Sequence, residues 1–371
     1  MPKRRRNDNT QSSKIEFLDL NLPYTIGESS KASATKKKTR LKIVIKAMEL
    51  GYTGVAYNHS IKGAMSNSDT CAISLIPLSS IVQVAPQTLF SSVKFHRELL
   101  NVPVNSPFRQ YTRLTVAVDS MIQVAALNSG NPVLKTYDLV AVKPSNQITF
   151  EQACKVAEVD IIAINFSDKL PFRMDFHNVK AAIKRGIYFE ITYSHLISDI
   201  NARRQMITNS KLLVEWTRGK NLIFSSAAAS ASELRGPYDV ANLSSLLGLS
   251  MKHAKAAISK NCRSLLHDSI QKKQYYKNAI KVERIISSTK PIDSKEAWFC
   301  DGDDHISSRE GDLLLDDVAT KVPKISKAID FASIAEKIAS NGFPLKDWLS
   351  PSKLPKMSKE VNLASIAEAM V

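Results

Sequence analysis

The sequence predicts an α/β fold in which a parallel sheet closes into a barrel, with one tail on each side of a single domain. Two observations predict it. Short apolar runs alternate with helical patterns, as expected when helices cover a parallel sheet. No Gly-rich phosphate-binding loop follows these runs, which favours a barrel over a dinucleotide-binding fold. The chain has 371 residues, 44% of them hydrophobic, enough for one large core.

Seven short apolar runs are the candidate strands. Each is four to six residues long, the usual length of a buried strand. In chain order they are residues 16–20, 54–57, 113–118, 139–142, 161–165, 188–192 and 221–225.

Helical patterns fill several of the intervals between these runs. They cover residues 40–50, 149–157, 178–185, 201–216 and 237–247. The last begins at Gly236-Pro237, because proline in a first helical turn loses no needed N–H. Gly248 fits a left-handed cap at its end, and Ser250 can cap a further helix that begins near Met251.

The helix predicted from Met251 onward is basic. Residues 251–285 contain nine Lys and Arg against two acidic residues, Asp268 and Glu283. Intervening apolar residues, such as Ile258 and Leu265, indicate one buried face. The exposed face of such a helix suits a polyanion.

Residues 235–263 closely resemble the conserved C-terminal block of the thirty-kilodalton protein subunit of ribonuclease P, which is shared with ribonuclease MRP. The resemblance covers residues 15–275. In the C-terminal block the matching segments are Arg235-Gly-Pro-Tyr-Asp-Val-Ala-Asn-Leu243, Leu246-Leu-Gly-Leu-Ser250, Ala254-Lys-Ala-Ala257 and Asn261-Cys-Arg263. Earlier in the chain they are Phe17-Leu-Asp-Leu20, Val55-Ala-Tyr-Asn-His59, Tyr137-Asp-Leu-Val-Ala-Val142 and Lys169-Leu-Pro-Phe172.

The resemblance implies a TIM-barrel-like fold related to the polymerase and histidinol phosphatase (PHP) group. It also implies a noncatalytic subunit that binds the ribonuclease P or MRP RNA and other protein subunits, including a small α/β partner. The particle would act on precursor tRNA 5′ leaders, on precursor rRNA, or on both. The implied location is the nucleus, and within it the nucleolus.

The charge distribution is consistent with an RNA partner. The formal net charge is +16 and the sequence pI is near 9.6. The alternative is a basic protein that is merely soluble. Residues 1–42 hold eleven Lys and Arg against four acidic residues, so the excess is concentrated. Within the predicted flexible arm, residues 1–14, the run Lys3, Arg4, Arg5 and Arg6 fits a nuclear address, an RNA-contacting arm or a solvated terminus equally well.

The predicted RNA contacts are basic residues on or beside helices. Shape-specific contacts to phosphates and 2′-hydroxyls are expected to dominate, because side chains cannot read the narrow major groove of A-form RNA. For each residue the alternative is a solvated helix face. The set is Arg203, Arg204, Arg235, Lys252, Lys255, Lys260 and Arg263, with Arg113 at a strand start as a weaker candidate.

The competing interpretation is a metal-dependent phosphoesterase of the PHP group. That group places a His-x-His pair on its first strand, and the matching positions here are Asp19 and Asn21, which are poorer transition-metal ligands. His59, Glu190 and His195 lie near strand ends, but Glu190 is also explained as a buried partner of a basic residue such as Arg185. No catalytic residues, metal site or cofactor are predicted, and the four cysteines are expected to be reduced.

The end of the chain differs in character from the predicted domain of residues 15–285. Residues 286–371 are expected to form an extension of low order, with eight acidic residues against two basic ones in residues 294–317. Residues 331–338 and 363–370 are a loose amphipathic duplicate, either partner-docking helices or an accidental repeat. Residues 70–93 carry no charge and are expected to be an irregular or edge region. No membrane span is predicted.

Overall fold

The computed structural model describes residues 15–25, 30–86, 88–274 and 327–330. Within them, strands β1 to β7 lie side by side in chain order, each parallel to the next. The sheet is nearly closed into a ring, because the chain after β7 returns to β1, where the Ala227 amide donates to the Asn21 carbonyl at 3.0 Å. The predicted α/β barrel is confirmed. The strands are β1 (Leu18–Tyr24), β2 (Gly54–Lys62), β3 (Phe108–Val118), β4 (Leu139–Pro144), β5 (Ile161–Ala163), β6 (Tyr188–Thr192) and β7 (Leu222–Ser225).

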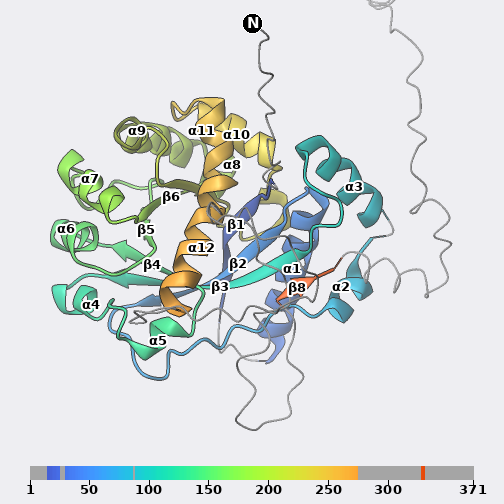
Figure 1. Ribbon diagram of the computed structural model, residues 1–371, viewed down its shortest axis with the longest axis horizontal. Helices are drawn as coiled ribbons and strands as arrows, with labels where there is room; N and C mark the ends of the chain where they lie inside the picture. Colours follow the sequence, from blue (N-terminus) through green and yellow to red (C-terminus); the bar gives the residue numbers. More distant parts are fainter. Residues whose placement is uncertain (1–14, 26–29, 87, 275–326, 331–371) are drawn as a thin grey trace, which may run out of the picture.

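Helices surround this barrel (Figure 1). All five predicted helices are present, although α1 begins ten residues earlier than expected. They are α1 (Ser30–Glu49), α6 (Gln147–Lys155), α7 (Phe176–Lys184), α9 (Ile200–Thr217) and α10 (Pro237–Ser245). The twelve-residue helix α3 (Leu89–Leu100) was not predicted, and neither were the shorter elements α2 (Leu78–Val84), α4 (Met121–Ala125), α5 (Pro132–Lys135), α8 (Ser194–Ser198) and the 3-10 turn η1 (Ala231–Glu233).

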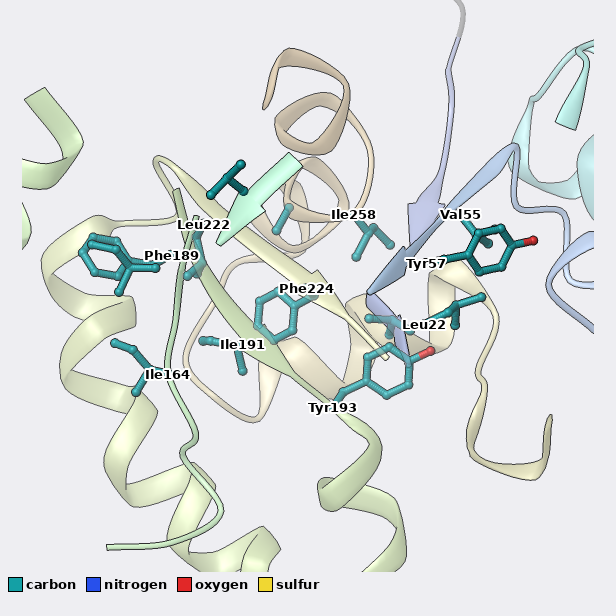
Figure 2. Packing of buried hydrophobic residues seen from close by; sticks show 14 of the residues in the cluster. Leu22, Val55, Tyr57, Ile164, Phe189, Ile191, Tyr193, Leu222, Phe224 and Ile258 are labelled. Carbon is teal, nitrogen blue, oxygen red and sulfur yellow. The ribbon is translucent and has the colours of Figure 1, made fainter. Parts of the chain in front are cut away.

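The larger core lies between the strands and the surrounding helices. Alternate residues of each strand point outward, as the two-residue period of a strand requires. Phe189 and Ile191 from β6 and Leu222 and Phe224 from β7 belong to this layer, as Figure 2 shows. They join buried residues of the outer helices, such as Leu213 of α9, in one apolar cluster.

A second, smaller core fills one end of the barrel interior. Residues of the opposite parity, including Leu139, Ile161 and Ile223, pack against Leu265 and Leu266 of α12 (Lys260–Gln274). In Figure 1, α12 is orange and lies in front of the strands. It therefore plugs one end of the barrel with apolar side chains.

Two predictions about chain organisation need correction. The basic helix from Met251 is two helices, α11 (Met251–Ala257) and α12, separated at Ile258-Ser259. The carbonyl of Ile258 is used there by the Leu18 amide, at 3.1 Å, instead of continuing the helix. Residues 70–93 are irregular only as far as Pro77, because α2 and the start of α3 follow.

Part of the predicted low-order extension packs on the barrel. Strand β8 (Ala328–Ile329) pairs antiparallel with the start of β3, and Ile329 is buried. Lys327 forms an ion pair with Asp138 at 2.8 Å. Two backbone pairings, one buried side chain and one ion pair thus hold this segment to the domain.

Several predictions lie outside the described residues. They concern the basic run Lys3 to Arg6 in the arm 1–14, the acidic run 294–317, the amphipathic duplicate and Cys300. Within the described ranges, Cys71, Cys154 and Cys262 are free thiols. No helix there is both long and apolar enough to cross a membrane.

Candidate nucleic-acid interface and the barrel interior

Helix α12 is fixed across the amino-terminal ends of the strands by polar contacts at both of its ends. Near its start, Asn261 Nδ2 donates to the Leu222 carbonyl at 2.7 Å, where β7 begins. Near its end, Ser269 Oγ donates to the carbonyl of Asp138 at 2.7 Å, the residue before β4. Lys273 Nζ donates to the same carbonyl at 2.6 Å. The helix is therefore a fixed platform.

The outer face of this platform carries the predicted cations. Cys262, Leu265, Leu266 and Ser269 point inward, whereas Lys260 and Arg263 are exposed. On α11, Lys252 and Lys255 are exposed as well. We call Lys252, Lys255, Lys260 and Arg263 the α11–α12 surface. Within the described part of the chain, no carboxylate lies within ion-pair distance of its three lysines. These charges are available to an external anion.

Lys255 joins this surface to the start of α10. Its Nζ lies 4.3 Å from the centre of the Tyr238 ring, a cation–π contact. The Tyr238 ring in turn meets Phe17 edge-on, with ring centres 6.3 Å apart. Tyr238 is half-buried and packs against the larger core of the barrel.

Arg235 is half-buried and shapes the loop before α10. Its guanidinium donates to the carbonyls of Ser232, at 2.6 Å, and Leu234, at 3.1 Å. Two tyrosine hydroxyls hold its backbone: Tyr52 donates to its carbonyl at 2.9 Å, and Tyr193 accepts from its amide at 3.3 Å. As predicted, Gly236 precedes the helix and Pro237 opens it. Arg235 thus holds a turn in shape.

Arg203 and Arg204 lie near the start of α9. The Arg203 guanidinium donates to the carbonyls of Leu196, at 2.5 Å, and Ile197, at 3.3 Å, at the end of α8. Arg204 is exposed. The far end of α9, which reaches α11, is about 20 Å away along a helix rising 1.5 Å per residue. The structure therefore does not bring these two arginines onto the α11–α12 surface.

Arg113 is enclosed in the barrel. Its side chain has no exposed surface, and its NH1 and NH2 atoms pair with Glu190 Oε1 and Oε2 at 2.5 and 2.6 Å. The expectation that Arg113 contacts RNA does not fit this position, because the guanidinium cannot reach a phosphate without opening the barrel. The suggestion that Arg185 pairs with Glu190 is also wrong. Arg185 instead donates to carbonyls at the end of α6.

The Arg113 and Glu190 pair belongs to a closed network of polar side chains. Arg113 Nε donates to Thr115, which donates to Asn58; Asn58 donates to Asn21, and Asn21 donates to Glu190, at 3.2, 2.7, 2.8 and 3.2 Å in that order. Ser225 Oγ also donates to Glu190, at 2.6 Å. A buried ion pair is stable only when the remaining hydrogen-bond donors and acceptors of both side chains also have partners, as they do here.

A β-bulge in β1 makes this network possible. The register with β2 shifts between Asp19 and Leu22, so β1 uses one residue more than its partner. Leu20 packs in the interior core, and Asn21 also points inward to reach Asn58 and Glu190. A bulge is the usual device for redirecting a side chain in this way.

Asp19, on the same strand, is buried apart from this network. Its Oδ1 accepts from the amides of Ser226, at 3.0 Å, and Asn21, at 3.2 Å, while Oδ2 has no hydrogen-bond partner. Burial raises the pKa of Asp19 to about 6, and the nearby Glu190 carboxylate adds to the rise. Burial likewise raises the pKa of the neighbouring Tyr193 hydroxyl.

The groups that a phosphoesterase would need do not converge. Glu190 is held by Arg113, and His195 lines a separate polar hollow of about 500 Å³ with Asp168 and Asp199. Among the described residues, no three His, Cys, Asp or Glu side chains are placed to hold a metal together. The interior has the chemistry of a structural ion pair. A sequence signal existed for it, namely Arg113 and Glu190, the single charged residues of the predicted strands 113–118 and 188–192.

Comparisons with known proteins agree with the predicted family. The family described as RNase P subunit p30 matches residues 16–274. Protein GAMETOPHYTE DEFECTIVE 1 of Arabidopsis thaliana is 53% identical over 341 residues, which cover 89% of this chain and 58% of that protein. This chain thus spans about three fifths of the length of that relative.

Two further similarities are more distant. The ribonuclease P protein subunit p30 of Mus musculus is 36% identical over 62% of this chain and 81% of its own length. Among solved structures, a chain of an archaeal ribonuclease P with mature tRNA aligns at 12% identity with a TM-score of 0.44, covering 74% of this chain and all of that one. On the match over residues 16–274, the chain belongs to the RNase P subunit p30 family.

Proposed function

We propose that the chain is a noncatalytic protein subunit of a ribonuclease P particle. In this role it binds the RNA of the particle and neighbouring protein subunits, and supports removal of 5′ leaders from precursor tRNA. The observation that carries the proposal is the α11–α12 surface: four exposed cations on two successive helices, of which α12 is fixed to the barrel at both ends, with no carboxylate at ion-pair distance from its three lysines in the described chain. Family membership supports the same conclusion.

Binding on this surface works by charge and geometry. Lys252, Lys255, Lys260 and Arg263 neutralise phosphates that a folded RNA packs closely, and so release condensed counterions. Because α12 is held at both ends, the backbone that carries Lys260 and Arg263 is already ordered before binding. Arg204 is a further exposed candidate, but it would contact a different part of the RNA.

The proposal extends to finer assignments that the family resemblance implies. The same subunit serves the ribonuclease MRP particle and precursor rRNA processing, pairs with a small α/β subunit, and resides in the nucleus, including the nucleolus. Curated relatives named as ribonuclease P subunits in Mus musculus and Schizosaccharomyces pombe support the nuclear assignment.

The test is to recover a tagged full-length chain from its own cells, sequence the RNA that accompanies it, and assay the particle on precursor tRNA. We expect a ribonuclease P RNA, an MRP RNA or both. A chain in which Lys252, Lys255 and Arg263 are changed together to Glu should recover less of that RNA, with a weaker dependence on salt. Recovery of no discrete RNA by the unchanged chain would contradict the proposal.

A further inference from the structure

The turn that follows α9 has an unusual backbone. Arg218, the cap residue of α9, has a φ of 50° and Gly219 a φ of 75°, and Asn221 follows with a φ of 49°. This left-handed region suits glycine and is tolerated by asparagine, but it is unfavourable for a branched or long side chain. Arginine therefore stands where glycine or asparagine would cost least.

The same turn is seated directly on the α11–α12 region. A Cβ atom at Gly219 would lie 2.6 Å from His253 Cβ on α11, so the backbone of Gly219 packs closely against the His253 side chain. Asn261 Nδ2, at the start of α12, donates to the Gly219 carbonyl at 3.2 Å. Asn221 Nδ2 donates to the Ile187 carbonyl at 3.2 Å, which fixes the other end of the turn.

Two exposed cations flank the glycine. Arg218 and Lys220 both project into solvent, and in the described ranges neither has an acidic side chain at ion-pair distance. Gly219 packs on His253, the residue after Lys252. Arg218 and Lys220 therefore extend the α11–α12 surface toward α9. A positive charge at the C-terminal end of a helix also interacts favourably with the helix dipole. An arginine one residue earlier would make the same interaction without a left-handed backbone.

We propose that the Arg218 to Asn221 turn is a further phosphate-binding element, in which Arg218 and Lys220 contact the RNA backbone beside the α11–α12 surface. This inference rests on the proposed RNA-binding function. Backbone strain at an exposed cation is the kind of outlier found at functional sites, where the rest of the structure over-determines it. The turn is so determined, by Asn261, by Asn221 and by its contact with α11.

The test compares Arg218→Asn with Arg218→Lys in the full chain, using the ribonuclease P RNA of the source organism transcribed in vitro as the probe. Arg218→Asn removes the charge and relieves the backbone. We expect its melting temperature to be unchanged or higher, its RNA affinity to fall about tenfold, and the salt slope to fall by about 1. Arg218→Lys keeps the charge and should retain most of the affinity.

Lys211 is an exposed lysine within α9, and Lys211→Asn is the matched control, which should leave the RNA affinity unchanged. Lys220→Gln, which leaves the strained positions intact, should weaken binding like Arg218→Asn. Normal RNA affinity of Arg218→Asn would overturn the inference. If its melting temperature also fell, Arg218 would have a structural role. Absence of binding by the unchanged chain would instead overturn the proposed function itself.

Discussion

Arg113 and Arg263 both lie on regular elements of the same barrel, but their environments are opposite. Arg113 has no exposed surface and is paired with Glu190, whereas Arg263 is exposed on the outer face of α12. The interior network uses charge to hold strands together, and the three lysines of the α11–α12 surface keep charge available for a partner. The comparison teaches that a basic residue is informative about binding only once its burial and its partner are known.

The largest expected effect comes from breaking the interior pair. Glu190→Gln leaves the Arg113 guanidinium buried without a counter-charge, and should lower the free energy of unfolding by about 3–5 kcal/mol. Urea unfolding measures it, with the exposed Glu215→Gln on α9 as the control. RNA affinity of the folded fraction should not change. A loss of affinity without a loss of stability would show that the interior takes part in binding.

A double replacement sharpens the same point. Arg113→Met combined with Glu190→Met removes both charges, so no unpaired ion remains in the barrel. We expect this variant to be more stable than the sum of the two single changes predicts, by about 1–3 kcal/mol of coupling. Additive losses in urea unfolding would mean that the two side chains do not act as a pair.

The buried carboxyl of Asp19 should make stability depend on pH. Its pKa is raised from 3.8 to about 6 in the folded chain, so the unfolded chain loses the proton first as pH rises. The contribution of Asp19 to the free energy of unfolding is therefore fully present below about pH 4. It falls by about 3 kcal/mol as the pH rises through 6. Asp19→Asn, measured by urea unfolding at pH 4 and pH 7, should remove this loss. The exposed Asp119→Asn should keep it.

An intermediate effect is expected where the signature segment meets the basic surface. Tyr238→Ala removes the contacts of its ring with Phe17 and Lys255, and should lower stability by about 1–3 kcal/mol. The melting temperature and the yield of the assembled particle should fall more than the RNA affinity does. Tyr238→Phe keeps the ring and is the control. Unchanged thermal stability would count against this role of the ring.

The smallest effects are expected from single exposed cations. Lys252→Ala should weaken RNA binding several-fold and lower the log–log salt slope by about 1, with no change in melting temperature. Arg204→Ala, at the other end of α9, should have a smaller effect on both. Equal effects of the two changes would mean that the RNA interface runs along the whole of α9.

Much of the fold was predictable because its periodicities are local. The seven strands and five helices were each found from apolar spacing, and the start of α10 from Gly236 and Pro237. Short elements such as α4 and α5 carry too few residues to show a period. The break between α11 and α12 escaped prediction because it depends on a bond from the Leu18 amide, more than two hundred residues away in the chain.

The sequence by itself determined the alternation of strands and helices, the family, and the identity of the basic segment, because these are properties of neighbouring residues. Only the tertiary structure decided which cations are free. It buried Arg113 against Glu190 across 77 positions of sequence, turned Arg203 and Arg235 onto carbonyls, and brought Arg218 beside α11. The physical reason is that burial and pairing are set by long-range contacts, which no local pattern of charge encodes.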